Sequence, residues 1–433
     1  MNDSARRERL TLALSVWAVL VSQVLLYPGV SDLVRALGGA GDLDAGMWFL
    51  VSEYAAFVVF AGLWGALSDA TGRRVPLIVV GAVGGVACYL LLSAVPSLGV
   101  GFGGVLLIRV VGGAFTIGAF SLSMTMLMDL GGGNGRNMGA AGIAIGLGAA
   151  VGSVVGGRLS TADPLAPVYG AAVLLGLVAV LTATVTDRSP GAERSGSGAS
   201  DGPAAGTNSR GDLGTNGPDG TDERAGAREV LRKVVDRPAL RVPYAFGFID
   251  RLTAGFFSLV GIYYFRDVFG LDAFGAGLVL AMFFGPFALL QYPMGVLSDR
   301  IGRFLPVVVG SILYGVSIVV VGASPSLALA AGAMVLVGVF GALVSPATMA
   351  LVTDIADADE RGAAMGGFNI FGSLGFLTGF LLGGSSAELL GYFEAFVVVG
   401  FTEIGIALVA SRAVRRLATG ESVAVPGVSE ADD

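Results

Sequence analysis

The sequence predicts an all-α membrane protein with twelve transmembrane helices in two pseudo-symmetric six-helix halves. Three observations lead to this fold class: apolar runs of about 20 residues recur along most of the chain, charged residues make up only 14% of it, and three short patterns occur twice in the same order. An apolar run of about 18 or more residues with few charges is typical of a helix that crosses a membrane.

Twelve apolar spans are expected, near residues 10–34, 46–67, 75–94, 99–127, 137–158, 167–186, 241–266, 273–296, 304–322, 326–352, 363–385 and 392–411. The first is too long for a cleaved signal sequence and has no small-residue cleavage site, so we expect it to be retained.

The connections between spans are mostly short, with one exception. Residues 187–240 are rich in Gly, Ser, Asp and Pro, which predicts a flexible linker. It would join an N-terminal half (1–186) to a C-terminal half (241–411), which is followed by a cytoplasmic tail (412–433).

Arginine placement predicts that both chain ends are cytoplasmic, because cytoplasmic connections are enriched in Lys and Arg. With this orientation the outer connections hold Arg35, Arg158 and Arg266. The inner segments, even without the linker, hold Arg6, Arg7, Arg9, Arg73, Arg74, Arg136, Arg300, Arg303, Arg361, Arg412, Arg415 and Arg416. We therefore expect a multi-pass protein of the cell membrane.

The composition argues against several classes of function. The chain has no histidine and a single cysteine, Cys88, so we expect no metal site, no cofactor and no Ser-His catalytic triad. No Gly-x4-Gly-Lys-Ser/Thr loop is present for nucleotide binding, which argues against an ATP-driven pump. The net charge is −7, and we expect no nucleic acid as a partner. The apolar spans make the lipid bilayer a partner. An enzyme is therefore not expected.

The repeated patterns divide the chain into two homologous halves. The string GALSDATGRRVPL begins at Gly65, and GVLSDRIGRFLPV begins at Gly295, 230 residues later. Asp129 and Asp354 each end a further span, followed seven residues later by an arginine. Glycines at 148, 152, 156 and 157 recur at 375, 379, 383 and 384. Two homologous halves around a central site are the design of many secondary transporters.

The repeated string is interpreted as a conformational latch between helices at the membrane surface. Gly72 permits a tight turn, and Gly65 is expected to let its span approach a neighbour closely. We expect Asp69 to accept hydrogen bonds from a helix N-terminus and Arg73 to reach Asp129. The second copy supplies the corresponding residues, which are Gly295, Asp299, Gly302, Arg303 and Asp354. The alternative is a static turn with arginines that extend to the interface.

These residues resemble the major facilitator superfamily, whose loop signature is Gly-x-Leu-Ala-Asp-Arg-x-Gly-Arg-Lys-x-x-Leu. The first copy matches it at Gly65, Leu67, Asp69, Gly72, Arg73 and Leu77; the second at Gly295, Leu297, Asp299, Arg300, Gly302 and Arg303. The resemblance covers all twelve spans and implies the fold of that family.

Two further motifs look similar to those of the family. LLIRVVGG matches the fourth-helix pattern Leu-x-x-Arg-x-x-Gln-Gly at Arg109 and Gly113, with Gly112 in place of glutamine. The fifth-helix glycine pattern of proton antiporters, Gly-x3-Gly-Pro-x2-Gly-Gly, is matched at Gly148, Gly152, Gly156 and Gly157, with Ser153 in place of proline. These four glycines, and the corresponding Gly375, Gly379, Gly383 and Gly384 of the second half, are expected to serve helix packing.

Charged residues deep in the spans are candidates for function, because a charge at mid-bilayer costs roughly 2.5–3.5 kcal/mol on insertion scales. Arg109 should face a cavity, with Glu53 as its partner and Asp32 at a shallower depth. Asp250 and Arg251 are adjacent on a helix and point about 100° apart, so we expect each to have its own partner. By resemblance, spans one, four, seven and ten line the cavity, and Asp250 becomes the leading proton site.

Weaker candidates complete the set. Glu403 lies on span twelve, which is peripheral in the family. Gln23, Tyr27, Tyr263 and Asn369 are candidates to line the cavity, but ordinary interhelical hydrogen bonding is the favoured explanation of each.

The expected function is secondary active transport of a small-molecule substrate, driven by protons or by sodium, by a monomer. Export is favoured over import because of the fifth-span glycine pattern. The alternatives are a proton- or sodium-coupled importer and a transporter-like sensor that moves nothing.

Overall fold

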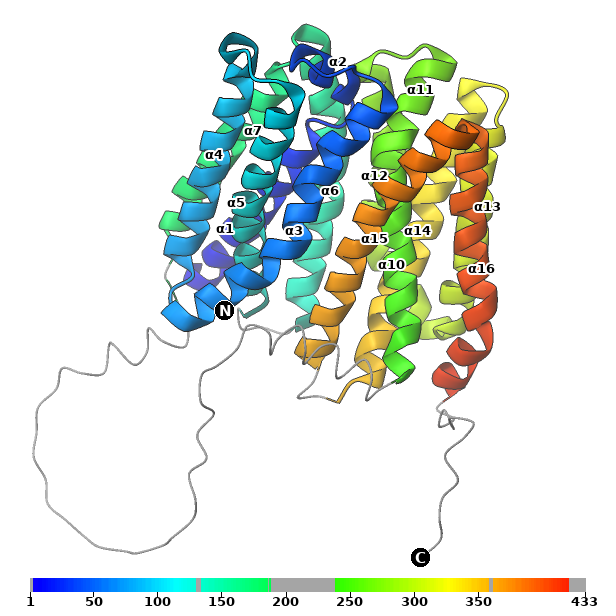
Figure 1. Ribbon diagram of the computed structural model, residues 1–433. Coiled ribbons are helices and arrows are strands. Elements are labelled where there is room, and N and C mark those ends of the chain that lie inside the picture. Colours follow the sequence, from blue (N-terminus) through cyan, green and yellow to red (C-terminus); the bar gives the residue numbers. More distant parts are fainter. Residues whose placement is uncertain (1–2, 130–133, 186, 188–237, 358–360, 420–433) are drawn as a thin grey trace, which may run out of the picture.

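The protein folds into one bundle of long helices, in which the first helix begins and the last helix ends on the same side (Figure 1). The computed structural model describes residues 3–129, 134–185, 187, 238–357 and 361–419. Most of the predicted linker and the end of the predicted tail, residues 188–237 and 420–433, lie outside the described residues. All regular secondary structure in the described part is helical.

The helices of the first half, in chain order, are α1 (Asp3–Val24), α2 (Val30–Ala36), α3 (Leu43–Thr71), α4 (Val75–Leu98), α5 (Phe102–Asp129), α6 (Asn134–Ala162) and α7 (Ala166–Ala183). Those of the second half are η1 (Pro238–Leu240), α10 (Arg241–Phe256), η2 (Phe257–Gly261), α11 (Ile262–Phe269), α12 (Ala273–Ile301), η3 (Leu305–Val309), α13 (Gly310–Ala323), α14 (Leu327–Ile355), α15 (Arg361–Leu390) and α16 (Tyr392–Thr419).

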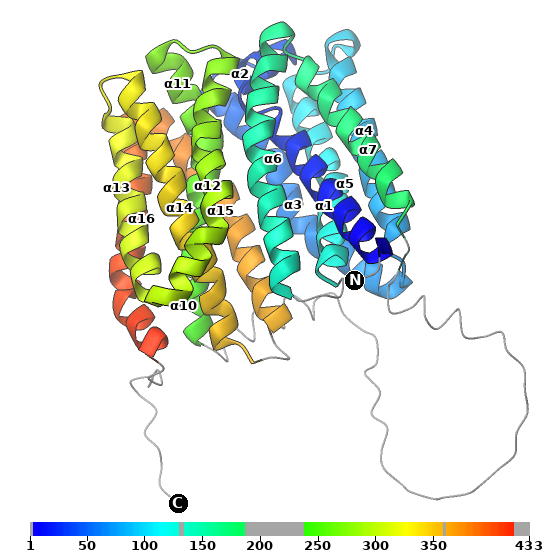
Figure 2. The same cartoon turned by 180° about the vertical axis from the view of Figure 1, so that it is seen from behind.

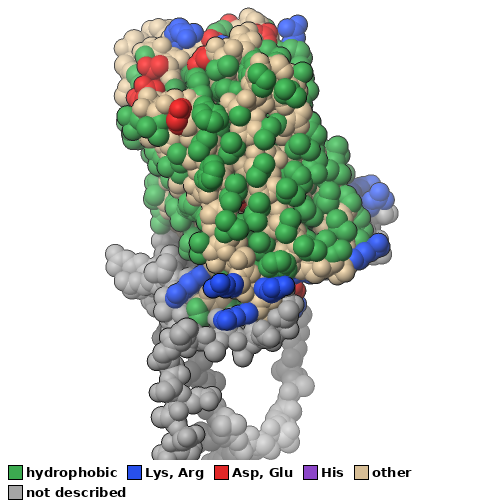
Figure 3. All heavy atoms as spheres, turned by 90° about the vertical axis from the view of Figure 1, so that its right-hand side faces the viewer, with side chains coloured by type: hydrophobic (Ala, Val, Ile, Leu, Met, Phe, Trp, Pro, Cys, Tyr) green, Lys and Arg blue, Asp and Glu red, His purple; other side chains and the backbone are tan. Residues whose placement is uncertain are grey.

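Among the described residues, ten helices are long and apolar enough to cross a membrane. The segments η1–α11 and η3–α13 each count as one of these, because their π-helical parts continue directly into α-helix: η2 joins α10 to α11, and η3 leads into α13. The two remaining predicted spans, in α1 and α6, fall outside this set, so the total of twelve stays a prediction. Figure 3 shows a broad hydrophobic surface above a rim of Lys and Arg side chains. We call the side on which α1 begins and α16 ends the terminal face, and the other side the opposite face.

The two halves lie side by side, and each is made from consecutive helices (Figures 1 and 2). α6 of the first half runs along α12 of the second, and α3 runs along α15. The halves therefore meet along two helix pairs, one at the back and one at the front of Figure 1.

The first predicted span is shorter than expected. It was expected to continue to residue 34, but α1 ends at Val24 and a separate helix, α2, begins at Val30. The cause is Pro28, which has no N–H to donate to the preceding turn. The chain around it makes hydrogen bonds that span three residues instead of four, such as that from Tyr27 N to the Val24 carbonyl at 3.1 Å.

The repeated glycine pattern forms one stripe on α6 and one on α15, and all eight of its glycines lie at contacts between helices. Gly148, Gly152 and Gly156 of α6 face residues 17–25 of the first span, and Gly375, Gly379 and Gly383 of α15 face residues 248–260. The last glycine of each stripe faces the other half: a Cβ on Gly157 would lie 2.5 Å from the Ala273 carbonyl, and one on Gly384 would lie 2.6 Å from Met47 Sδ. Small residues thus bring backbones together within each half and between the halves.

We expect Gly379→Ala to destabilise the protein by about 1–3 kcal/mol, the usual cost of overpacking. Its Cβ would lie 2.8 Å from the backbone nitrogen of Phe256, which cannot move without shifting α10. The matched control is Gly405→Ala, because Gly405 is a mid-helix glycine with open space around it. Thermal unfolding of both purified variants tests this, and equal melting temperatures would contradict it.

Candidate functional site

A buried ion pair occupies the middle of the first half. The Arg109 guanidinium on α5 pairs with the Glu53 carboxylate on α3, and both side chains are almost fully buried. Tyr89 of α4 donates to Glu53 Oε1 at 3.4 Å, and the guanidinium lies 4.3 Å from the centre of the Phe49 ring. Gly113 permits this arrangement, since a Cβ there would lie 2.6 Å from the Glu53 carbonyl oxygen.

The expectation that Arg109 faces a cavity is wrong. The space beside the pair amounts to about 10 Å³ and is lined by residues of α3, α4 and α5, including Cys88 and Tyr89. That volume barely admits one water molecule. The pair is therefore satisfied inside its own half, and it ties three helices together.

The expectation that Asp250 and Arg251 do not pair is also wrong. Arg251 Nε lies 3.8 Å from Asp250 Oδ2, within ion-pair range but too far for a hydrogen bond. Asp250 is 4% exposed and its Oδ1 has no hydrogen-bond partner among the described residues. The Arg251 side chain is 34% exposed. It bends along α15, where its Cγ would lie 3.2 Å from a Cβ on Gly372.

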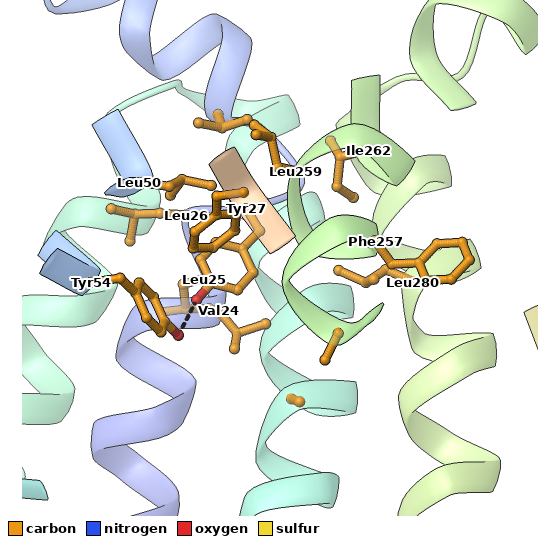
Figure 4. Packing of buried hydrophobic residues seen from close by; sticks show 14 of the residues in the cluster. Val24, Leu25, Leu26, Tyr27, Leu50, Tyr54, Phe257, Leu259, Ile262 and Leu280 are labelled. Atoms are coloured by element: carbon orange, nitrogen blue, oxygen red, sulfur yellow. Dashed lines mark hydrogen bonds between the residues drawn. The ribbon is translucent and has the colours of Figure 1, made fainter. Parts of the chain in front are cut away.

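Aromatic rings close the centre of the bundle between the halves. Tyr54 of α3 stacks on Phe376 of α15 at a centroid distance of 4.7 Å, and Phe380 meets both Tyr54 and Tyr27 edge to face. The Tyr27 and Tyr54 hydroxyls are hydrogen-bonded at 2.7 Å, as Figure 4 shows. Gln23 lies behind them, 3.5 Å from the Tyr54 hydroxyl. Gln23 and Tyr27 are buried at this closure and do not line an open cavity.

α3 and α15 separate from this aromatic closure toward the terminal face (Figure 1). Ser373 and Asn369, one and two turns below Phe376 on α15, are exposed. Gly65 on α3 has open space around it, so the expected close approach at Gly65 is wrong.

A network of contacts between the halves closes the opposite face. Arg266 of α11 donates to Asp32 of α2 at 2.6 Å, and the Tyr263 hydroxyl donates to the Asp42 carbonyl at 2.8 Å. These residues line a depression of about 590 Å³. Asp32 also pairs with Arg35, so this residue, which was expected at a shallower depth than Glu53, belongs to the closure of the opposite face. The structure is thus closed on the opposite face.

The first copy of the repeated string uses different residues from those expected. Arg74, and not Arg73, pairs with Asp129 at the end of α5. The acceptor at the N-terminus of α4 is not Asp69, which is exposed. It is Asp187, whose Oδ2 accepts from the backbone nitrogens of Arg74 and Val75 at 2.9 and 3.1 Å.

In the second copy the expected residues meet. Arg303 donates to Asp299 at 2.6 Å and to Asp354 at 3.1 Å. Partial burial lowers the pKa of the Arg303 guanidinium, but its hydrogen bonds to both carboxylates outweigh this and raise the pKa above its ordinary value. Arg303 therefore stays charged at any physiological pH.

The turn explains why two similar strings place their arginines differently. Gly72 and Gly302 both have positive φ, as expected for a tight turn, but ψ is 23° at Gly72 and 167° at Gly302. The chain that follows each glycine therefore takes a different course, and the arginine that pairs with the aspartate is Arg74 in the first copy and Arg303 in the second.

Sequence reasoning missed Tyr89, Asp187 and the Arg266–Asp32 pair. Tyr89 is one apolar-run aromatic among many, and Asp187 stands at the start of a polar linker. Arg266 was counted only for orientation, although a charge at the end of a span opposite another charge, Asp32, was a usable signal.

The chain is similar in sequence to known proteins. The sequence profile of the Major Facilitator Superfamily matches residues 12–276 and 244–429. A class G tetracycline resistance protein of Vibrio anguillarum is 25% identical over 79% of this chain and 80% of its own length. An uncharacterized MFS-type transporter of Methanocaldococcus jannaschii is 30% identical over 36% of this chain and 42% of its own. The multidrug efflux pump LfrA of Mycolicibacterium smegmatis is 33% identical over 26% and 22%.

Solved structures share the fold. A bacterial homolog of the human lysosomal transporter Spinster, inward-facing and unoccupied, has a TM-score of 0.73 at 15% identity and covers 98% of this chain and all of its own. A D-xylose-proton symporter has a TM-score of 0.64 at 15% identity, over 92% of this chain and 96% of its own.

We expect Glu53→Gln to destabilise the protein by about 3–5 kcal/mol, because it leaves the buried Arg109 charge without a counter-ion. The double variant Glu53→Leu/Arg109→Met removes both charges and should regain most of that loss. Thermal unfolding of the two variants and of wild type measures the coupling. A double variant less stable than Glu53→Gln would refute the reading of these residues as a mutually compensating pair.

Proposed function

The chain belongs to the major facilitator superfamily, and from this premise we propose that it exports a small amphipathic solute in exchange for protons. It works as a monomer in the cell membrane, with the terminal face on the cytoplasmic side. The single observation that carries proton coupling is Asp250, a buried carboxylate with Oδ1 unpartnered and a long contact from its other oxygen to Arg251.

The pair Asp250–Arg251 suits a coupling site because its two members differ in access. Asp250 is buried, whereas the Arg251 side chain is about one third exposed. Protonation of Asp250 removes the negative charge that holds the Arg251 side chain. The position of the Arg251 guanidinium beside α15, and therefore its contact with a solute, changes as a result. A charged carboxylate in this place is costly without a counter-ion, so proton binding and solute binding are linked through Arg251.

The surface for the solute is aromatic on one side and polar on the other. Tyr54 and Phe376 form the roof, and Ser373 and Asn369 lie below it. Such a surface favours a flat amphipathic molecule. The names of two relatives, a multidrug efflux pump and a tetracycline resistance protein, favour export of a compound of this kind.

Alternating access then consists of rocking one half against the other. The closure at Arg266, Asp32 and Tyr263 opens, and α3 and α15 come together at the terminal face. Arg74–Asp129 and Arg303–Asp354 each join helices of one half, which suits latches that keep each half rigid. The glycines at positions 157 and 384 let the halves pivot at close range.

A liposome assay tests this function. Purified protein is reconstituted with a pH-sensitive dye inside, a proton gradient is imposed, and amphipathic compounds are added to wild type and to Asp250→Asn. We expect a compound to drive protons opposite to its own movement in wild type, and at least tenfold less in Asp250→Asn. Asp163→Asn, at an exposed position between α6 and α7, is the control and should behave as wild type.

Other outcomes decide against parts of the proposal. Protons that move in the same direction as the compound make the protein a symporter. A compound that binds without any flux of solute, protons or sodium makes it a sensor.

Closure of the opposite face can be trapped with a disulfide. Met47 of α3 lies against Gly384 of α15, where a Cβ would be 3.1 Å from Met47 Cγ, so Met47→Cys/Gly384→Cys meets the spacing of a disulfide. In a Cys88→Ala background we expect oxidation to abolish transport and a reductant to restore it. Met47→Cys alone is the control, and unchanged transport in the cross-linked protein would contradict alternating access.

A further inference from the structure

A second group of buried polar residues lies in the C-terminal half and has no role so far. It consists of Thr253 on α10, Ser311 and Tyr314 on α13, and Glu403 on α16, all of which are 0% exposed. Asp250 completes it. Glu403 and Asp250 interact electrostatically, and Tyr314 interacts with both carboxylates. Three helices thus direct oxygen atoms into one place.

These oxygens are unsatisfied to a degree seen nowhere else in the described residues. Six atoms of the group have no hydrogen-bond partner there, namely Asp250 Oδ1, Thr253 Oγ1, Ser311 Oγ, Tyr314 Oη and both Glu403 carboxylate oxygens. Buried polar groups are normally paired, and an unpaired one costs free energy. Ser311 contacts Glu403 and Thr253 contacts Tyr314, so the oxygens converge, but these contacts do not satisfy their hydrogen-bonding capacity.

The hydroxyls of the group are directed away from their own helices. Ser258 and Ser317, in neighbouring turns of the same two spans, donate to the carbonyl four residues earlier, as buried helical serines commonly do. Thr253 and Ser311 make no such bond. Their oxygens face Tyr314 and Glu403 instead, where a ligand shared by the group can bind them.

Close packing fixes the carboxylate in this position. α13 and α16 approach through Gly315 and Gly400: a Cβ on Gly315 would lie 2.5 Å from the Gly400 carbonyl and 3.2 Å from Glu403 Cβ. The Tyr314 hydroxyl reaches α14, 3.2 Å from the Cβ position of Gly341. Glu403 is fully buried in this packing, so its charge must be met locally.

Charge balance identifies the class of ligand. Two carboxylates and Arg251 sum to −1, and Tyr314 and Ser345 are the neutral groups that face them from α13 and α14. The other charged residues of α10, α14, α15 and α16 stand toward the helix ends. One monovalent cation neutralises the site, and carboxylate and hydroxyl oxygens are the ligands that hard cations prefer.

We propose that Asp250, Glu403, Thr253, Ser311 and Tyr314 form a buried site for one monovalent cation, a proton or Na⁺. The site deepens the proposed function, on which it rests, because it extends the coupling site from Asp250 to Glu403. With a proton, the carboxyls alone hold the cation and the hydroxyls bond to them. With Na⁺, the hydroxyl oxygens are ligands.

The test is thermal unfolding of the purified protein, followed by its tryptophan fluorescence, without any transported compound. One series adds NaCl at alkaline pH against choline chloride of equal ionic strength, and a second lowers the pH in choline chloride. We expect wild type to gain stability in one of the two series. Glu403→Gln should lose that gain and be at least as stable as wild type where the cation is scarce, because its neutral amide needs no cation. Glu394→Gln, at an exposed position on the same helix, should respond as wild type does.

The two cations separate clearly. A gain with NaCl that Ser311→Ala and Thr253→Val abolish identifies Na⁺; a gain on acidification that both of these variants keep, and Glu403→Gln loses, identifies a proton. The proposal is overturned if Glu403→Gln responds to Na⁺ and pH as wild type does. Should Glu403→Gln fail to fold, equilibrium binding of radioactive Na⁺ and proton release by wild type decide instead, with a stoichiometry far below one cation overturning the site. A protein that binds the cation but moves none in liposomes refutes the coupling and leaves the site intact.

Discussion

The cost of an ionised group in a medium without water governs this structure. A charge at mid-bilayer needs a counter-ion or a ligand, and each half meets this demand in its own way. The first half joins Glu53 to Arg109 in a tight pair that spends no space on a cavity. The second half buries two carboxylates, Asp250 and Glu403, near one loosely placed arginine, Arg251. This imbalance between the halves is the reason why we propose the second half as the coupling site.

Close backbone contact is the second requirement, because lipid offers no hydrophobic force between helices. The glycine stripes of α6 and α15 meet it within each half, and the last glycine of each stripe faces the other half. The same residues thus hold each half together and form the surfaces on which the halves meet. Polar closures such as Arg266–Asp32 are few, which suits contacts that form and break at modest cost.

The arrangement of the two faces follows from these contacts. Aromatic rings and the Arg266 network join the halves from the centre to the opposite face, whereas α3 and α15 part toward the terminal face. In the alternating access that we propose, the solute binds at the point where these two helices diverge.

The sequence by itself determined the helical class, the division into halves, the turns at Gly72 and Gly302 and the choice of Glu53 for Arg109. These depend on local hydrophobicity, on a repeat, and on the shortage of other charges at that depth. Only the tertiary structure decided that Arg74 replaces Arg73, that Asp187 caps α4 from 112 or 113 residues away, and that Glu403 turns inward toward Asp250. A turn's ψ angle and the meeting of helices distant in the chain set these contacts, and neither leaves a periodic trace in the sequence.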